Sequence, residues 1–213
     1  MKRFRQVRGI AIPMARADID TDAIIPQQWL ITTERSGLGG GLFGNWRYLN
    51  ATRDLNATRA PDPGFILNDP RLRGARILVA GPNYGCGSSR EHAVWAHLDF
   101  GIEAVIAPSF GQIFYYNALK NGLAVIRLEL GITSNILASL LALPGQEMTV
   151  DLLANTVIGP DGTQHSFAME ADRREALLLG RDDIAATLEM SEAITAFQKA
   201  DRLRRPWVWG TMI

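Results

Sequence analysis

The chain has very little cysteine and histidine for its length. Of its 213 residues, three are histidine and only Cys86 is cysteine. A single cysteine excludes an internal disulfide, and it cannot hold an iron–sulfur cluster, which takes about three or four thiolates. We therefore expect no metal or cofactor on this chain and a reducing, cytoplasmic location. If the chemistry needs a cluster, another chain must supply it.

The sequence also lacks an excess of either charge and lacks any long apolar run. Lys plus Arg and Asp plus Glu number 22 each. This balance removes any general attraction to nucleic acid or to an anionic membrane surface. No stretch approaches the roughly 20 apolar residues of a membrane span, and the charged start, residues 1–5, is not followed by the apolar region of a signal peptide. We expect neither a nucleic-acid nor a membrane partner.

The spacing of the hydrophobic residues, which are 47% of the chain, predicts an α/β fold. Its predicted centre is a parallel βαβαβ unit with right-handed crossovers. Its strands are residues 76–80, 104–107 and 123–128, and its helices are residues 89–100 and 109–121. Gly101 and Gly122 are expected to end the two helices, and Ser109 with Gln112 forms a capping-box pattern at the start of the second.

Flanking segments complete the predicted fold. We expect strands at 6–14, 147–153 and 156–158, with the last two forming an antiparallel hairpin, and helices at 134–143, 171–179 and 182–204. Glycine-dense residues 34–44 are predicted to form a mobile loop, and residues 60–64 a turn. The chain is predicted to be a single domain, residues 1–213, with a core at about 5–160 and a C-terminal helical extension at about 168–206.

The glycine-rich turn before the first central helix gathers the most chemistry. It reads Gly-Pro-Asn-Tyr-Gly-Cys-Gly-Ser-Ser-Arg-Glu-His over residues 81–92. A strand that leads into a helix start presents free N–H groups and the positive end of the helix dipole, so this position suits an anion. The simpler alternative is that Ser88 only caps the helix, with Glu91 completing the Ser-x-x-Glu box.

Standard motifs decide little about this turn. A dinucleotide fingerprint needs glycine where Arg90 stands, and a phosphate-binding P-loop needs a lysine that the turn lacks. A Cys–His hydrolase remains open, with Cys86 activated at the helix start. A module that merely captures a carboxylate, without catalysis, also remains open.

Four motifs together resemble one known family. They are Asp-Thr-Asp-Ala-Ile-Ile-Pro at 20–26, Leu-Phe-Gly-Asn-Trp-Arg-Tyr at 42–48, the turn at 83–92, and Ala-Pro-Ser-Phe-Gly-Gln-Ile-Phe-Tyr at 107–115. The set is similar to the swivelling domain of the aconitase superfamily, and within it to the small subunits of 3-isopropylmalate dehydratase. The resemblance implies a single swivelling β/β/α domain with C-terminal helices.

The resemblance also implies a divided enzyme. In this family a 4Fe–4S cluster lies on a separate large subunit, and the two subunits act as a hydro-lyase of leucine biosynthesis on a small dicarboxylate substrate. By resemblance Ser88 matches the catalytic serine base, and Arg90 and, less closely, Ser89 match substrate contacts. Asp22 matches an aspartate that pairs with a histidine of the cluster-bearing part, although a solvated turn or a helix cap also explains the Asp-x-Asp pattern.

Other residues carry weaker implications. Arg35 is the nearest match for a substrate-binding arginine after the Thr-Asp motif, but it aligns imperfectly and suits a surface loop equally. Leu38, Leu42 or Phe43 would cover an isopropyl group if the glycine-dense loop discriminates substrates. Related hydro-lyases that act on 2-methylmalate (citraconate) or homoaconitate remain alternatives within the family.

Overall fold

The computed structural model describes residues 1–30, 34–49, 59–88 and 90–210, so candidate residue Ser89 lies outside the described residues. Contacts divide the chain into two compact units, Met1–Gly180 and Arg181–Ile213. The assignment of a single domain with a helical extension stays a prediction. No helix among the described residues is long and apolar enough to span a membrane.

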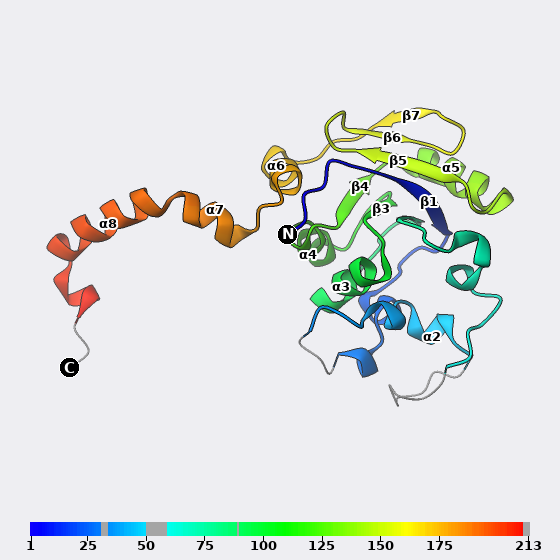
Figure 1. Cartoon of the computed structure of the whole chain (residues 1–213), viewed down its shortest axis with the longest axis horizontal. Coiled ribbons are helices and arrows are strands. Elements are labelled where there is room, and N and C mark those ends of the chain that lie inside the picture. The colour runs from blue at the N-terminus through cyan, green and yellow to red at the C-terminus, as the bar shows by residue number, and fades with distance from the viewer. Residues whose placement is uncertain (31–33, 50–58, 89, 211–213) are drawn as a thin grey trace. The chain divides into compact units, whose positions relative to one another are not determined.

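The first unit is built on a mixed sheet of seven strands in the order β4-β3-β2-β1-β5-β6-β7 (Figure 1). The strands are β1 (Gln6–Met14), β2 (Ile77–Ala80), β3 (Ala104–Ala107), β4 (Ala124–Arg127), β5 (Glu147–Asp151), β6 (Thr156–Ile158) and β7 (Gln164–Ser166). Every residue of β2 and β3 is buried, as expected where a sheet is covered on both faces. The α/β class and the parallel centre are confirmed.

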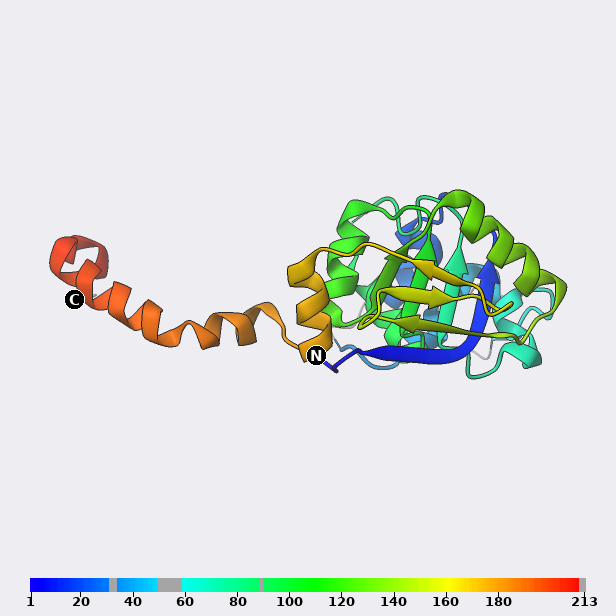
Figure 2. The same cartoon turned by 90° about the horizontal axis from the view of Figure 1, so that it is seen from above.

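Strand β1 joins two different halves of this sheet. Its first part pairs antiparallel with β5, from Gln6 opposite Asp151 to Ile10 opposite Glu147. Its last four residues pair parallel with β2, ending with Met14 opposite Ala80. Figure 2 shows β1 in blue turning between the two halves. The carboxyl ends of β1, β2 and β3 therefore lie at one edge.

Helices connect and cover the parallel half. They are α3 (Glu91–Phe100), α4 (Gln112–Asn121) and α5 (Leu130–Ala142), with α6 (Ala171–Leu179) near the end of the first unit. Gly101 and Gly122 end α3 and α4 in the left-handed conformation, with φ of 105° and 88°, as the sequence predicted. Helix α5 begins one turn earlier than predicted, and β7, a short edge strand, was not predicted.

The glycine-dense segment is more ordered than the sequence indicated. After α1 (Thr21–Ile24) and the 3₁₀ turn η1 (Gln27–Trp29), it forms the 3₁₀ turn η2 (Gly39–Gly41) and helix α2 (Gly44–Arg47). Leu38, Leu42 and Phe43 are at most 1% exposed, which corrects the expectation that they line a substrate loop. Two further 3₁₀ turns, η3 (Ile66–Asn68) and η4 (Pro70–Leu72), precede β2.

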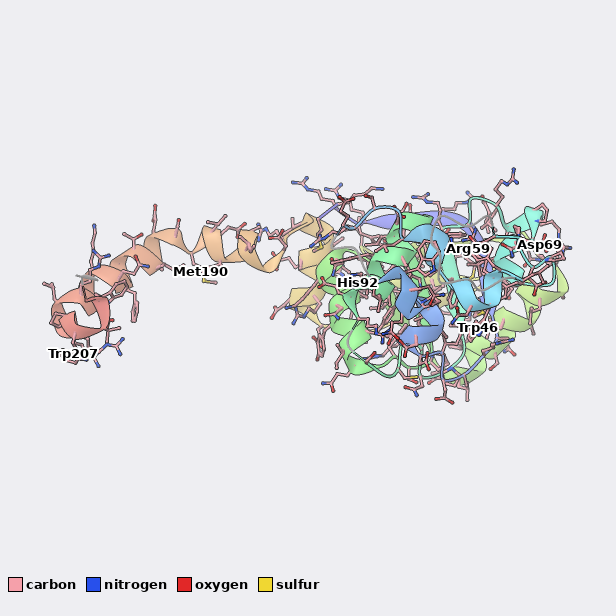
Figure 3. The ribbon with its side chains drawn as sticks, turned by 90° about the horizontal axis from the view of Figure 1, so that it is seen from below. Trp46, Arg59, Asp69, His92, Met190 and Trp207 are labelled. Carbon is pink, nitrogen blue, oxygen red and sulfur yellow. The ribbon has the colours of Figure 1, made fainter. Side chains whose placement is uncertain are left out.

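The second unit consists of helices. The predicted single helix at 182–204 is divided at Met190 into α7 (Asp183–Glu189) and α8 (Ser191–Arg204), followed by the 3₁₀ turn η5 (Pro206–Trp209). Figure 3 labels Met190 at the break and Trp207 in the terminal turn. Asp201 accepts hydrogen bonds from Arg205 and Trp209, which fixes η5 against α8.

Candidate active site

Three connections meet where the parallel strands end. They are residues 15–20 after β1, residues 81–88 after β2 and residues 108–111 after β3. Isolated bridges join the first two connections at Asp20 and Cys86, and the last two at Tyr84 and Phe110. The carboxyl edge of a parallel sheet is the usual place for a ligand in α/β folds. Three of the four motifs of the sequence, those at 20–26, 83–92 and 107–115, therefore converge on a position suited to a binding site.

Backbone hydrogen bonds hold the glycine-rich turn against the connection after β1. The N–H of Gly85 donates to the carbonyl of Ile19 at 2.7 Å, and the N–H of Thr21 donates to the carbonyl of Cys86 at 2.9 Å. Gly85 has a φ of +72°, and a Cβ there would lie 2.3 Å from the Phe114 ring. Only glycine fits this position without moving a neighbour, because both the backbone conformation and the space exclude a side chain.

Ser109 holds the other side of the turn. Its hydroxyl accepts a hydrogen bond from the N–H of Asn83 at 2.8 Å, and its carbonyl accepts one from the N–H of Tyr84 at 3.0 Å. Helix α4 begins after Gly111, which makes no side-chain cap. The predicted capping box is therefore wrong, because the Ser109 side chain bonds to the turn rather than to its own helix.

Ser88 is exposed at the end of the turn and does not cap α3. The cap residue of α3 is Arg90, which makes no side-chain cap bond, and Glu91 accepts a hydrogen bond from Asn121 at 2.6 Å instead. The Ser88 hydroxyl instead lies 3.2 Å from the hydroxyl of Thr21, which also donates to the Ser88 carbonyl at 3.0 Å. The alternative of a helix-capping Ser88 is thus wrong.

Arg90 and Asp22 form an ion pair across the same edge. The Asp22 side chain is 61% exposed and that of Arg90 is 24% exposed. Asp20 is the residue that caps α1, through a hydrogen bond from the N–H of Ala23 at 2.7 Å, which confirms one of the roles considered for the Asp-x-Asp pattern. The carboxylate of Asp22 therefore remains accessible, beside the guanidinium that was predicted to bind substrate.

Arg35 packs against helix α3. Its guanidinium stacks over the Trp95 ring at 5.2 Å, and the His92 ring is 4.8 Å from the same tryptophan. Figure 3 labels His92 in the first turn of α3. The described contacts bring Ser88, Arg90 and Asp22 together and join Arg35 to Trp95 instead. A role of Arg35 in substrate binding stays a prediction.

Cys86 is placed where a thiolate is disfavoured. Partial burial raises the pKa of its thiol, and the nearby carboxylates of Asp20 and Asp18 raise it further. A nucleophilic cysteine needs a lowered pKa and a positive environment. The surroundings of Cys86 therefore oppose the hydrolase alternative and suit a small packed residue of a tight turn.

A buried pair lies beneath the turn. The Tyr84 hydroxyl is 2.6 Å from Nε2 of His97, and Nδ1 of His97 is 2.6 Å from the carbonyl of Ala93. Burial lowers the pKa of His97 to about 4, so its ring is neutral near pH 7. A carbonyl only accepts, so Nδ1 carries the single ring proton and Nε2 accepts from Tyr84. This bond anchors the turn to α3.

Sequence reasoning missed two residues of this arrangement, Thr21 and His97. Thr21 is 1% exposed and bonds to Ser88, and His97 is completely buried beneath Tyr84. The position of Thr21 inside the Asp-Thr-Asp motif was the one signal that could have found it. The pattern around His97 indicates only a surface or packing histidine.

The described residues contain no group of three or more His, Cys, Asp or Glu side chains arranged to hold a metal ion. Together with the single cysteine, this donor set does not fit an iron–sulfur cluster, which takes about three or four thiolates. No step of the chemistry is therefore assigned to a metal held by this chain.

Family models cover most of the sequence. Residues 1–130 match the aconitase C-terminal domain, and residues 136–171 match a model described as LeuD_N. Residues 183–211 match the C-terminal domain of the 3-isopropylmalate dehydratase small subunit. The model that covers residues 1–130 contains the turn, Asp22 and Ser109.

Individual proteins give a consistent result. A 3-isopropylmalate dehydratase small subunit from Cupriavidus necator is 47% identical over 209 residues, 98% of each chain. One from Bordetella parapertussis is also 47% identical, over 98% of this chain and 100% of its own. The solved structure of a 3-isopropylmalate dehydratase from Methanocaldococcus jannaschii is 27% identical, covers 91% of this chain and 99% of its own, and superposes with a TM-score of 0.63.

Proposed function

The chain belongs to the aconitase C-terminal domain family and, within it, to the 3-isopropylmalate dehydratase small subunits, and we propose that it performs that function with a large subunit. The proposed reaction removes water from 2-isopropylmalate and adds it back with the hydroxyl on the neighbouring carbon, giving 3-isopropylmalate. This is a step of leucine biosynthesis.

One observation supports this proposal above the others. The exposed Ser88 hydroxyl, the Arg90 guanidinium and the Asp22 carboxylate meet at the carboxyl edge of the parallel sheet. Ser88 offers a hydroxyl for proton transfer, Arg90 offers a cation that can bind a substrate carboxylate, and Asp22 offers an accessible carboxylate. They do not offer a Lewis acid for the departing hydroxide. The arrangement is therefore half of a dehydratase site.

We assign the proton transfer to Ser88. As an alkoxide its Oγ takes the proton of the poorly acidic C–H bond, and as a hydroxyl it returns that proton when water adds to the double bond. Serine is a very weak acid, so this role needs donors aimed at Oγ. Arg90 then holds a substrate carboxylate, because its planar guanidinium can donate two parallel hydrogen bonds to the two oxygens.

We assign Asp22 to the junction with the large subunit. By the family pattern it pairs with a histidine of that subunit, and its 61% exposed side chain is available for such a contact. Arg90 would then exchange Asp22 for the substrate carboxylate. The 4Fe–4S cluster belongs on the large subunit, where it supplies the Lewis acid for the departing hydroxide. Closing the two chains together excludes bulk water.

Reconstitution tests the proposal. The purified chain, the cognate large subunit and their mixture are assayed with 2-isopropylmalate, 2-methylmalate and homoaconitate. We expect turnover in the mixture alone, and highest with 2-isopropylmalate. Robust turnover by the isolated chain would contradict the divided site. A preference for either of the other two acids would assign the chain to a related hydro-lyase.

A further inference from the structure

Thr21 contacts Ser88 directly, although the two residues are far apart in sequence. Its side chain is 1% exposed, and its hydroxyl oxygen lies 3.0 Å from the Ser88 carbonyl and 3.2 Å from the Ser88 hydroxyl. Its own N–H donates to the carbonyl of Cys86, two residues before Ser88, at 2.9 Å. One buried threonine therefore contacts both the backbone and the side chain of the proposed base.

Counting protons shows how this contact works. A threonine hydroxyl has one proton to donate and two lone pairs to accept. A carbonyl accepts only, so the Thr21 proton is directed to the Ser88 carbonyl. Toward the Ser88 hydroxyl, Thr21 is then the acceptor and Ser88 the donor. In this state the contact fixes the rotamer of a neutral Ser88.

When Ser88 is ionised, the direction of the contact must change. An alkoxide has no proton to donate, whereas the Thr21 hydroxyl can turn about its C–O bond and donate to Oγ. No proton passes between the two residues, and the proton lost by Ser88 on ionisation goes to solvent. A hydrogen bond to a charged acceptor is roughly twice as strong as a neutral one. Because Thr21 is buried, its hydroxyl and not bulk water contacts Oγ from the protein side.

We infer that Thr21 is a positioning residue for Ser88, which holds its side chain when neutral and donates to its oxygen when ionised. The inference rests on the proposed function, because it concerns the proton-transfer step of that reaction. It assigns to the Asp-Thr-Asp motif a second role beside that of Asp22. The other charged and titratable groups on the two segments that meet here are Arg16, Asp18, Asp20, Asp22, Tyr84, Cys86 and Arg90.

The first test uses the reconstituted complex. Thr21→Val keeps the shape of the side chain and removes the hydroxyl, whereas Thr21→Ser keeps the hydroxyl. We expect Thr21→Val to lower kcat about tenfold to a hundredfold, with KM changed by less than about twofold because Arg90 is retained. Its activity relative to wild type should rise with pH, and Thr21→Ser should recover most of kcat.

Thr133→Val is the matched control. Thr133 is also 1% exposed, and its hydroxyl also donates to backbone carbonyls, at 3.0 Å to Glu129 and 3.4 Å to Leu128. It lies on α5, whose contacts are with β1, β2 and β3. We expect kcat and its pH dependence to be unchanged in this variant. Equal losses in Thr21→Val and Thr133→Val would overturn the inference, because a general structural role would explain both.

The second test needs no turnover and uses the full chain alone. Cys86→Ala with Ser88→Cys leaves one thiol, at position 88, whose thiolate is titrated by its ultraviolet absorbance with and without Thr21→Val. We expect Thr21→Val to raise that thiol pKa by about one unit, a tenfold change in the thiolate equilibrium. An unchanged pKa would overturn the inference, even if Thr21→Val lowers activity.

The two tests also separate this inference from the proposed function. If the wild-type complex does not isomerise 2-isopropylmalate, the proposed function fails, while the thiol titration still decides whether Thr21 stabilises an anion at position 88. If the wild-type complex is active and Thr21→Val matches it in kcat and pH dependence, only the inference fails.

Discussion

Two glycine-rich segments of the first unit differ in what surrounds their glycines. In residues 37–44 two of the glycines allow close packing: a Cβ on Gly39 would lie 2.7 Å from the backbone N of Phe100, and one on Gly41 would lie 2.5 Å from Trp29. The larger side chains on either side of these glycines, Leu38 and Phe43, are buried in the core. The segment is therefore part of the packed interior.

In residues 81–87 the glycines turn the chain. Gly85 and Gly87 have positive φ angles of 72° and 89°, which reverse the backbone between β2 and α3. The polar side chain that follows, Ser88, is exposed at the edge of the sheet. Glycine density alone thus predicts neither mobility nor a binding site. What separates the segments is whether the side chains beside the glycines are apolar or polar.

One buried residue contacts both segments. The His97 ring lies 6.3 Å from the Phe43 ring, edge to face, and accepts the 2.6 Å hydrogen bond from Tyr84. Substitutions can therefore perturb the turn at residues 81–87, the packed segment at residues 37–44, or the contact between them.

Ser88→Ala should have the largest effect. We expect kcat of the reconstituted complex to fall about 10²- to 10⁴-fold, the range for loss of a proton-transfer group, with unfolding free energy unchanged because Ser88 is exposed. Steady-state kinetics and chemical denaturation measure the two quantities. Cys86→Ala is the control and should retain activity. The reverse pattern would favour the hydrolase alternative and would remove the distinction between the two segments.

Phe43→Ala should act on stability and not on substrate choice. Removing a fully buried phenylalanine costs about 3–5 kcal/mol, and the loss is measured by chemical denaturation of the isolated chain. The control Leu49→Ala, at a side chain that is 63% exposed, should change stability by less than about 0.5 kcal/mol. A changed preference among malate-type acids with unchanged stability would restore the idea of a substrate loop.

Acid should weaken the contact that joins the segments. The pKa of His97 is about 4 in the folded chain and 6.5 when unperturbed, so the unfolded chain binds the proton more tightly. The stabilisation by neutral His97 is complete above about pH 6.5 and is lost as the pH falls toward 4. The loss in the free energy of unfolding is about 3 kcal/mol.

Denaturation curves at several pH values between 4 and 7 measure this loss. His97→Gln keeps an acceptor for Tyr84 and removes the titrating ring. The difference in stability between wild type and variant should shrink or reverse as the pH falls. The same pH slope in both proteins would show that His97 does not carry the effect.

The smallest predicted effect compares two glycines. Gly85→Ala and Gly37→Ala both place an alanine at positive φ. A Cβ at residue 85 would meet the Phe114 ring, whereas a Cβ at residue 37 would meet none of the described residues within 4 Å. Gly85→Ala should therefore be less stable than Gly37→Ala by about 1–3 kcal/mol, the range for overpacking. Equal losses in thermal or chemical denaturation would mean that backbone conformation alone requires glycine in both segments.

The elements that sequence predicted well are those whose signals are local. A run of β-branched and other apolar residues predicted β3 with its observed bounds, and Gly101 and Gly122 correctly predicted the ends of α3 and α4. The third antiparallel strand was missed because Gln164–Ser166 is short and has no fully buried residue. Its hydrogen bonds come from β6, so only the neighbouring strand makes it a strand.

The sequence by itself determined the chemical inventory and the central βαβαβ unit. It has a single cysteine, a serine and an arginine after a glycine turn, and apolar runs at strand and helix spacing. It also carried the four motifs that indicated the family. These properties belong to residue types and to contacts within one turn or strand, so no distant neighbour is needed to find them.

Only the tertiary structure decided which of these residues lie together. In the fold, the Ser109 hydroxyl accepts a hydrogen bond from Asn83 instead of capping its own helix, and Phe43 is buried. Thr21 lies beside Ser88 where the ends of two strands meet. Hydrophobic spacing specifies which face of an element is buried, but not which partner covers it. The partner is set by the parallel pairing of β1 with β2, which also places the proposed half-site at the carboxyl ends of these strands.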